Sequence, residues 1–161
     1  MMAALLRNIR RRSLGELSML GAALALRAVL LAALRIVSFA RLRRVGPLFA
    51  RSRVAATGHA LEQRVGWAVA TAGVLLPAAN SCLADALAAH WLLAACGCRS
   101  TIRYGVVKTP AHTLRAHAWV EAPGGIIVGA AGAGAFTVLE RSVRLQPERD
   151  RNHFGAPPAM R

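Results

Sequence analysis

The sequence NSCLADALAAHWLL, residues 80–93, decides how the rest of the chain is interpreted. It has the signals of a helix, because Asn80 and Ser81 are both good N-cap residues and Pro77 stands just before them. Gly97 follows at the place where a left-handed C-cap is expected. The stretch therefore predicts one helix with well-marked ends.

Cys82 lies in the first turn of this predicted helix. Unpaired backbone N–H groups and the positive end of the helix dipole meet there, and both favour the thiolate, the reactive form of sulfur. A nucleophile fits this position, and so does a small buried apolar residue. Residues at helical spacing predict an inward face on the same helix. They are Leu83, Ala86, Leu87, Trp91 and Ala94.

The sequence AHAWVE, residues 116–121, alternates like a β-strand. It places His117, Trp119 and Glu121 on one face of that strand. A histidine on a strand that follows a cysteine at a helix start is the arrangement of a Cys–His nucleophilic pair. We therefore take Cys82 and His117 as the candidate catalytic residues.

These motifs, in this order, resemble those of the stand-alone transglutaminase-like B proteins, the leader peptidases of lasso peptide biosynthesis. The resemblance rests on Cys82-Leu83, the helix ending in Gly97, a strand over 102–106, HAWVE at 117–121 and the glycine turn after it. It covers about residues 77–145. It implies an α+β fold in which a cysteine at a helix N-terminus packs on a small antiparallel sheet, as in papain-like peptidases.

The resemblance also implies the reaction and its partners. Cys82 would attack the amide between the leader and core of a lasso precursor peptide, and His117 would move the proton. A separate ATP-dependent lasso cyclase would then close the ring. Because the N-terminal half is helical, with no leader-recognition domain apparent, we expect a separate leader-recognition protein.

A third group usually orients the histidine of such a pair. In the family that these motifs resemble, the third group is an Asp on the strand that follows the turn after the histidine. Here residues 122–136 contain neither Asp nor Glu. The nearest acids are Glu121 and Asp85, and Asp85 also fits a helix acid stabilised by the dipole. Three alternatives stay open: a backbone carbonyl or water orients His117, a nonstandard acid does, or the enzyme is weakened.

Composition favours a cytoplasmic protein without cofactors. Three cysteines, an odd number, with no secretory signal argue against a disulfide framework. Cys96 and Cys98 are interpreted as packing residues, because no second pair completes a metal site. The glycine-rich run at 129–134 lacks the Lys-Ser/Thr of a phosphate loop, and metal and flavin signatures are absent.

The net charge of +14 is concentrated in the first third of the chain, where residues 1–53 hold eleven arginines and one acid, Glu16. A basic region of this kind suits an anionic membrane or an acidic peptide. A solvated arginine face in a chain of biased composition is an equal alternative. We expect no nucleic acid partner, because stacking aromatics and recognised folds are missing.

Residues 13–40 predict a long helix that begins with a capping box formed by Ser13 and Glu16. Its segment 17–34 is long and apolar enough to raise the question of a membrane span. Arg27 lies in the middle of the segment, in phase with Arg35, which suggests a wet stripe. We therefore expect a helix that packs on the domain or rests at the inner membrane face, and not a span.

The remaining chain predicts further helices and then strands. We expect a basic break at 41–47, helices at 48–56 and 59–76, and strands at 99–107, 115–121, 125–128 and 136–143. The domain organisation is then a helical N-terminal region (1–76), a transglutaminase-like core (77–145) and a tail (146–161). Two functions compete with the peptidase: a membrane-associated interaction protein, and a transglutaminase-type acyl transferase that uses the same pair of residues.

Overall fold

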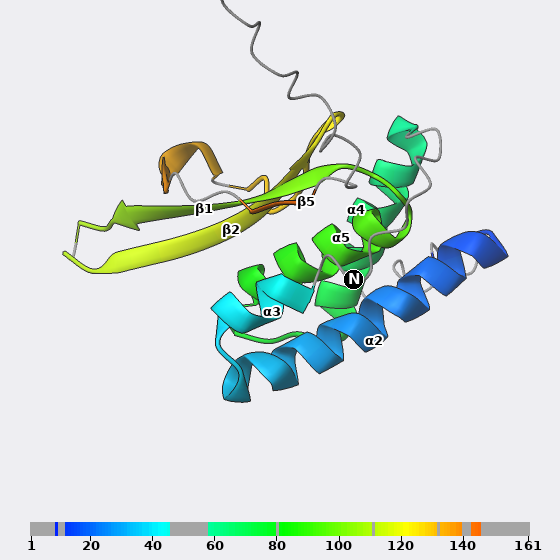
Figure 1. Cartoon of the computed structure of the whole chain (residues 1–161), viewed down its shortest axis with the longest axis horizontal. Coiled ribbons are helices and arrows are strands. Elements are labelled where there is room, and N and C mark those ends of the chain that lie inside the picture. Colours follow the sequence, from blue (N-terminus) through cyan, green and yellow to red (C-terminus); the bar gives the residue numbers. More distant parts are fainter. Residues whose placement is uncertain are drawn as a thin grey trace, which may run out of the picture.

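The structure of the protein is a computed structural model. It describes Ile9 and residues 12–45, 58–79, 81–110, 112–131, 133–139 and 143–145. The described residues form helices first and strands afterwards (Figure 1). The helices are α2 (Leu14–Ile36), α3 (Phe39–Val45), α4 (His59–Leu75) and α5 (Cys82–Ala95).

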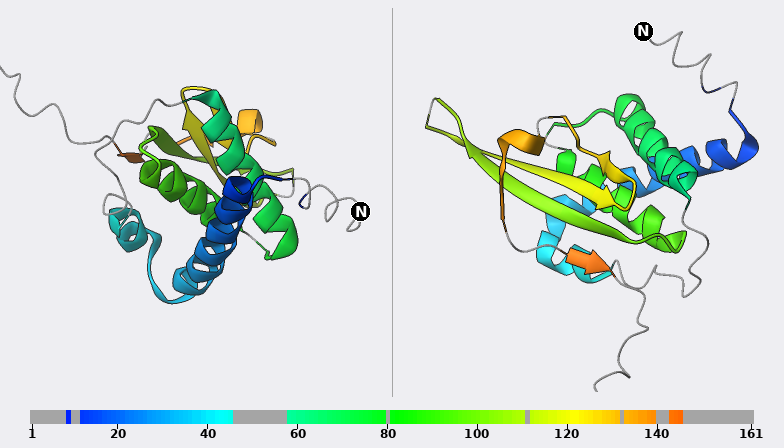
Figure 2. Two further views of the ribbon diagram at one scale, coloured as in Figure 1. Left: turned by 90° about the vertical axis from the view of Figure 1, so that its right-hand side faces the viewer. Right: turned by 90° about the horizontal axis from the view of Figure 1, so that it is seen from above.

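One antiparallel sheet follows, in the strand order β3-β2-β1-β4, with β5 pairing with β1 as well. Its elements are β1 (Ser100–Lys108), β2 (Leu114–Ala122), β3 (Gly125–Val128), β4 (Thr137–Val138) and β5 (Val143–Leu145), with the short 3-10 helix η2 (Ala133–Ala135) before β4. The α-helices lie on one side of the sheet and η2 on the other (Figures 1 and 2). The predicted α+β fold is confirmed.

The core lies between α5, its neighbouring helices and one face of β1 and β2. Alternation along the strands places Ile102 of β1 and Ala118 and Val120 of β2 on the face that packs against the helices. On the helix side, the most completely buried side chains include Val65 of α4 and Leu87 of α5. Small residues predominate in α5, which lets the helix approach the sheet closely.

The predicted helix signals are confirmed at both ends of the helical half. Ser13 and Glu16 form the capping box of α2. After α5, Gly97 has φ 76°, and the N–H of Cys98 donates to the carbonyl of Leu93 at 2.8 Å. This left-handed glycine ends the cysteine helix and turns the chain toward β1.

Two predicted boundaries are wrong. The first helix ends at Ile36, because Val37 is extended (φ −114°, ψ 132°), and residues 39–45 form α3 where a break was expected. Arginine is a good helix former, so the basic composition does not interrupt the helix. The predicted helix at 48–56 and the tail at 146–161 lie outside the described residues.

The single strand predicted at 136–143 is also wrong. Its place is taken by β4 and β5, which pair with separate parts of β1: β4 with Gly105 and Val106, β5 with residues 100–102. Phe136 lies before β4 and outside the sheet ladder. The nine-residue β1 is long enough to hold both short strands in succession.

The predicted wet stripe is contradicted at Arg27, which is only 1% exposed. Its guanidinium forms an ion pair with Asp85 of α5, and its Nε donates to the carbonyl of Leu76 at 3.0 Å. Burial lowers the pKa of Arg27, but the carboxylate and the carbonyl compensate for the lost water. One side chain of α2 thereby contacts the end of α4 and the first turn of α5.

We predict that Arg27→Ala lowers the free energy of unfolding by about 3–5 kcal/mol, because it leaves the Asp85 carboxylate without its positively charged partner in a poorly hydrated site. Urea denaturation followed by circular dichroism measures the change. Arg35→Ala is the control, since Arg35 is exposed near the end of the same helix and its loss is expected to change stability by about 0.5 kcal/mol or less. Equal effects of the two substitutions would contradict the structural role of the ion pair.

Candidate active site

Cys82 is the first residue of α5, and its side chain is half-buried. Ser81 occupies the N-cap position, but its hydroxyl donates to Asp85 Oδ2 at 3.1 Å instead of capping a backbone N–H. Ser81 therefore holds the N-cap position that the sequence indicates, without a hydrogen bond from its side chain to the helix backbone, and Asn80 lies outside the described residues. Asp85 is engaged by Ser81 and by Arg27, which confirms its interpretation as a structural acid of the first helical turn.

His117 lies in β2, directly opposite Gly105 of β1. Its Nε2 is 2.8 Å from the carbonyl oxygen of Gly129, just after β3. A carbonyl only accepts hydrogen bonds, so Nε2 carries the proton in this contact and Nδ1 is left to accept one. Of the three alternatives open in the sequence, the structure supports a backbone carbonyl as the group that orients His117.

Two aromatic rings lie beside the imidazole. The ring of Trp119 is stacked with it at a centroid distance of 6.1 Å, and the ring of Phe136 lies at 5.1 Å. Gly105 makes room for this arrangement, because a Cβ there would come within 2.6 Å of Phe136 Cβ. The sequence analysis did not identify Gly129 or Phe136, since neither a backbone carbonyl nor a loop phenylalanine has a distinctive motif.

Glu121 is not the group that orients His117. Its two oxygens accept hydrogen bonds from Trp119 Nε1 and from Arg103 Nε, each at 3.0 Å. Burial by itself raises the pKa of Glu121, but the hydrogen bonds from Trp119 and Arg103 and the positive charge of Arg103 outweigh it and lower the pKa. Glu121 therefore fixes the indole of Trp119, and through it one wall beside the imidazole.

The two candidate residues lie on different sides of the sheet. Cys82 is on the side of the helices, and His117 is on the other face. Ala118 and Val120 face α5 in the core, so His117 projects from the opposite face, where η2 lies (Figure 1). Within the described residues, no hydrogen bond joins the thiol of Cys82 to the imidazole of His117. Their pairing stays a prediction.

Measured along the direction of β1 and β2, Cys82 and His117 lie at about the same position. Because only a short turn separates Ala95 from Ser100, α5 runs back beneath β1 (Figure 1). Its 14 residues span about 20 Å, the length of about six strand residues. This places Cys82 at about the level of Val106, which pairs with the residue just before His117.

The other described histidines and cysteines have separate surroundings. His59 is exposed at the start of α4, and its Nε2 lies 2.8 Å from Gln63 Nε2. His112 is exposed in the loop between β1 and β2, and His153 lies outside the described residues. His90 is buried in α5, where burial lowers its pKa to about 4 and its Nδ1 lies 2.7 Å from the hydroxyl of Ser100. Cys96 is half-buried, and Cys98 is buried with its pKa raised by burial.

We predict that Gly129→Ala disrupts the contact between His117 and the backbone. Gly129 has φ 82°, a conformation that costs alanine about 1–2 kcal/mol, and a Cβ there would meet Ala118 O and Trp119 Cβ at 2.8 Å. NMR of the His117 ring nitrogens should show a protonated Nε2 in the wild type and a mixture of tautomers in the variant.

Gly134→Ala serves as the matched control, because a Cβ on Gly134 would have no neighbour within 4 Å. It should leave the tautomer of His117 unchanged. If Gly129→Ala also leaves it unchanged, the Gly129 carbonyl does not set the orientation of the imidazole.

Comparison with known proteins assigns the family. Residues 17–141 match the profile of the transglutaminase-like superfamily, described as Transglut_core3. No significant match was found among curated proteins or among solved structures. The match includes most of α2, the cysteine helix and the histidine strand, and this superfamily includes cysteine peptidases and acyltransferases. The chain belongs to the transglutaminase-like superfamily.

Proposed function

We propose that the protein is a cysteine peptidase that removes the leader from a lasso peptide precursor, with Cys82 as nucleophile and His117 as base. The observation that carries this proposal is the hydrogen bond from His117 Nε2 to the Gly129 carbonyl. It fixes the imidazole in the tautomer whose Nδ1 can accept a proton. A base held in one tautomer by a polar partner is a recurring component of nucleophilic catalysis.

The proposed reaction proceeds through a thioester. His117 Nδ1 takes the proton of the Cys82 thiol, and the sulfur attacks the carbonyl carbon of the scissile amide. The proton then passes to the leaving amine, which departs as the core peptide. Water, deprotonated by the same nitrogen, cleaves the thioester, releases the leader carboxylate and restores the thiol.

Backbone N–H groups at the start of α5 are the proposed donors to the oxyanion that forms at each addition step. These N–H groups point out of the N-terminal end of α5, where Cys82 lies. This arrangement requires no particular side chain.

Proton transfer requires the thiol and Nδ1 to come within hydrogen-bond reach. In the described structure no hydrogen bond joins them, so the proposed reaction requires the two side chains to approach each other. The edge of the sheet offers a route for this approach. β3 ends at Val128, opposite Val120, and no strand of the described residues pairs with β2 on that side at His117. A substrate peptide that reaches this edge would meet the start of α5 and the imidazole at the same level.

The lasso precursor is proposed from the motifs that resemble the leader peptidases, and the superfamily match agrees with the coarser assignment to cysteine peptidases and acyltransferases. The separate leader-recognition protein, the ATP-dependent cyclase and the cytoplasmic location belong to the same proposal. The odd number of cysteines fits a reducing compartment.

We predict that Cys82→Ala and His117→Ala each reduce precursor cleavage by about a thousandfold or more, as expected when a nucleophile or its base is removed. Cleavage is followed by mass spectrometry of the precursor, with the leader-recognition protein present. Cys96→Ala is the matched control at the other end of the same helix, and it should retain activity. Cleavage by Cys82→Ala at the wild-type rate would exclude the proposed mechanism.

Acyl transfer to an amine is the second candidate function, because the superfamily includes acyltransferases and the thioester is common to both reactions. The same mass spectra distinguish them. Hydrolysis yields a free leader carboxylate and a free core N-terminus, whereas transfer adds the mass of the amine to the acyl fragment and releases no carboxylate.

We predict that omitting the leader-recognition protein lowers the cleavage rate by about tenfold or more, since a second binding site on the leader raises the effective concentration of the scissile bond. The test compares initial rates with and without that protein at one precursor concentration. A precursor with a scrambled leader is the control and should show no dependence on it. An undiminished rate without the protein would exclude the two-component arrangement.

A further inference from the structure

The outward side of α2 carries no charge over most of its length. Between Glu16 and Arg35 the only charged residue is Arg27, and it points into the protein toward Asp85. A helix on the surface of a soluble domain normally shows charged and polar residues to water. Here Val29 is 62% exposed, and the other exposed positions from 18 to 32 are Ala, Gly and Ser.

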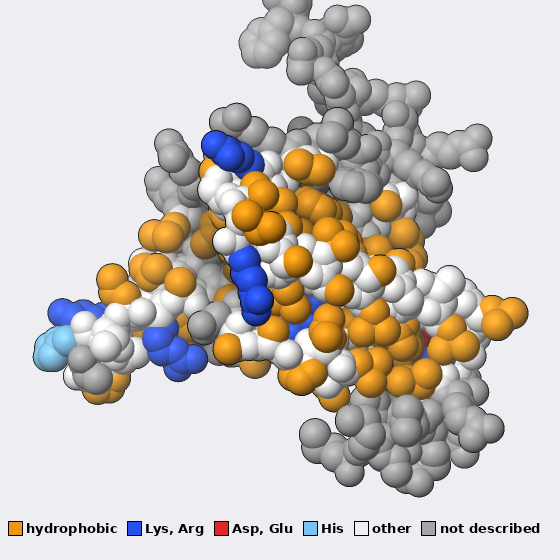
Figure 3. Space-filling model, turned by 90° about the horizontal axis from the view of Figure 1, so that it is seen from below, with side chains coloured by type: hydrophobic (Ala, Val, Ile, Leu, Met, Phe, Trp, Pro, Cys, Tyr) orange, Lys and Arg blue, Asp and Glu red, His pale blue; other side chains and the backbone are white. Residues whose placement is uncertain are grey.

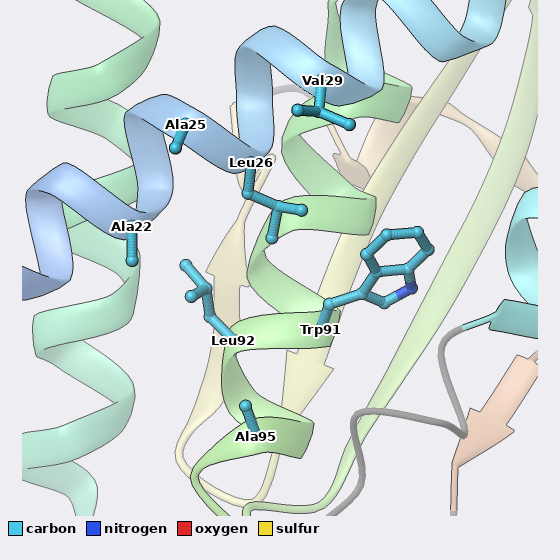
Figure 4. Close-up of a pocket in the computed structure, with 7 residues that line it drawn as sticks. All are labelled: Ala22, Ala25, Leu26, Val29, Trp91, Leu92 and Ala95. Atoms are coloured by element: carbon cyan, nitrogen blue, oxygen red, sulfur yellow. The ribbon is translucent and has the colours of Figure 1, made fainter.

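This apolar side continues into a groove between α2 and α5, with a volume of about 370 Å³. Figure 4 shows Ala25, Leu26 and Val29 on α2 facing Trp91 and Leu92 on α5 across it. We call the exposed side of α2 from 18 to 32, together with this groove, the α2 face. A contiguous exposed apolar surface is a mark of sites that bind a protein or a membrane.

Positive charge lies beside the α2 face. Arg35 and Arg41 are exposed near the C-terminal end of α2 and in α3, and Figure 3 shows several separate Lys and Arg side chains to one side of a largely hydrophobic surface. The chain as a whole has a net charge of +14. An apolar helix face with cationic flanks matches the headgroups and acyl chains of an anionic bilayer.

We propose that the α2 face rests on the surface of an anionic lipid bilayer, with α2 lying in the plane of the interface. The helix is also long and apolar enough to cross a membrane, with a mean hydropathy of 2.1. A span would, however, break the ion pair with Asp85 and expose the side of α2 that carries Leu20, Ala23 and Leu30 in the core. The buried ion pair therefore favours the interfacial position.

Flotation of the full-length protein with vesicles tests the proposal. Two compositions are compared, phosphatidylcholine alone and an equal mixture of phosphatidylcholine and phosphatidylglycerol, each at low and high salt. We expect binding to the anionic vesicles, weakened by salt. Ala25→Glu should lower the bound fraction on the order of tenfold, because it places a carboxylate in the contact.

Ala60→Glu is the matched control. It makes the same change at an exposed position at the start of α4, and it should bind like the wild type. If Ala25→Glu fails to fold by circular dichroism, Val29→Asn replaces it and should also weaken binding. Wild-type binding by the folded variant, no binding of the wild type to anionic vesicles, or resistance of the bound protein to alkaline carbonate would each overturn the interfacial proposal.

Discussion

The buried ion pair between Arg27 and Asp85 is the constraint on which the helical half depends. It joins the middle of α2 to the first turn of α5, and the same guanidinium reaches the carbonyl of Leu76 at the end of α4. A buried charge of this kind is tolerated only with its partner in place. Because Asp85 lies one turn from Cys82, the contact that seats α2 also fixes the start of the cysteine helix.

The same constraint explains the unusual surface of α2. A helix of this composition would ordinarily turn its one mid-helix charge to water and its apolar residues inward. Because Arg27 forms an ion pair with Asp85 inside the protein, the opposite side of α2 presents mainly alanine, glycine and valine. The apolar surface is thus a consequence of how the cysteine helix is held in place.

On the sheet, a backbone carbonyl contacts His117 where the resemblance leads one to expect an acid. The carbonyl of Gly129 accepts from His117 Nε2, and the carboxylate of Glu121 is used on Trp119 and Arg103. A neutral carbonyl fixes the tautomer but stabilises an imidazolium less than a carboxylate does. We therefore expect a slower enzyme than one with a complete triad, partly offset by the intrinsic nucleophilicity of cysteine.

Local signals in the sequence were sufficient for the elements but not for the contacts between distant segments. The capping box at Ser13, the left-handed Gly97 and the alternation at 116–121 each depend on neighbouring residues, and the structure confirms them. The partner of Arg27 lies 58 residues away by its number, and the partner of His117 is a main-chain oxygen. Neither has a motif, so the wet stripe was wrong and the orienting group stayed open.

The pairing of Cys82 with His117 is the central claim, and the reactivity of the thiol tests it most directly. Alkylation of Cys82 by iodoacetamide at mildly acidic pH, followed by mass spectrometry of the modified peptide, measures how much reactive thiolate the imidazole sustains. The account predicts a rate at least about tenfold higher in the wild type than in His117→Ala. Equal rates in the two proteins would show that the histidine does not act on this cysteine.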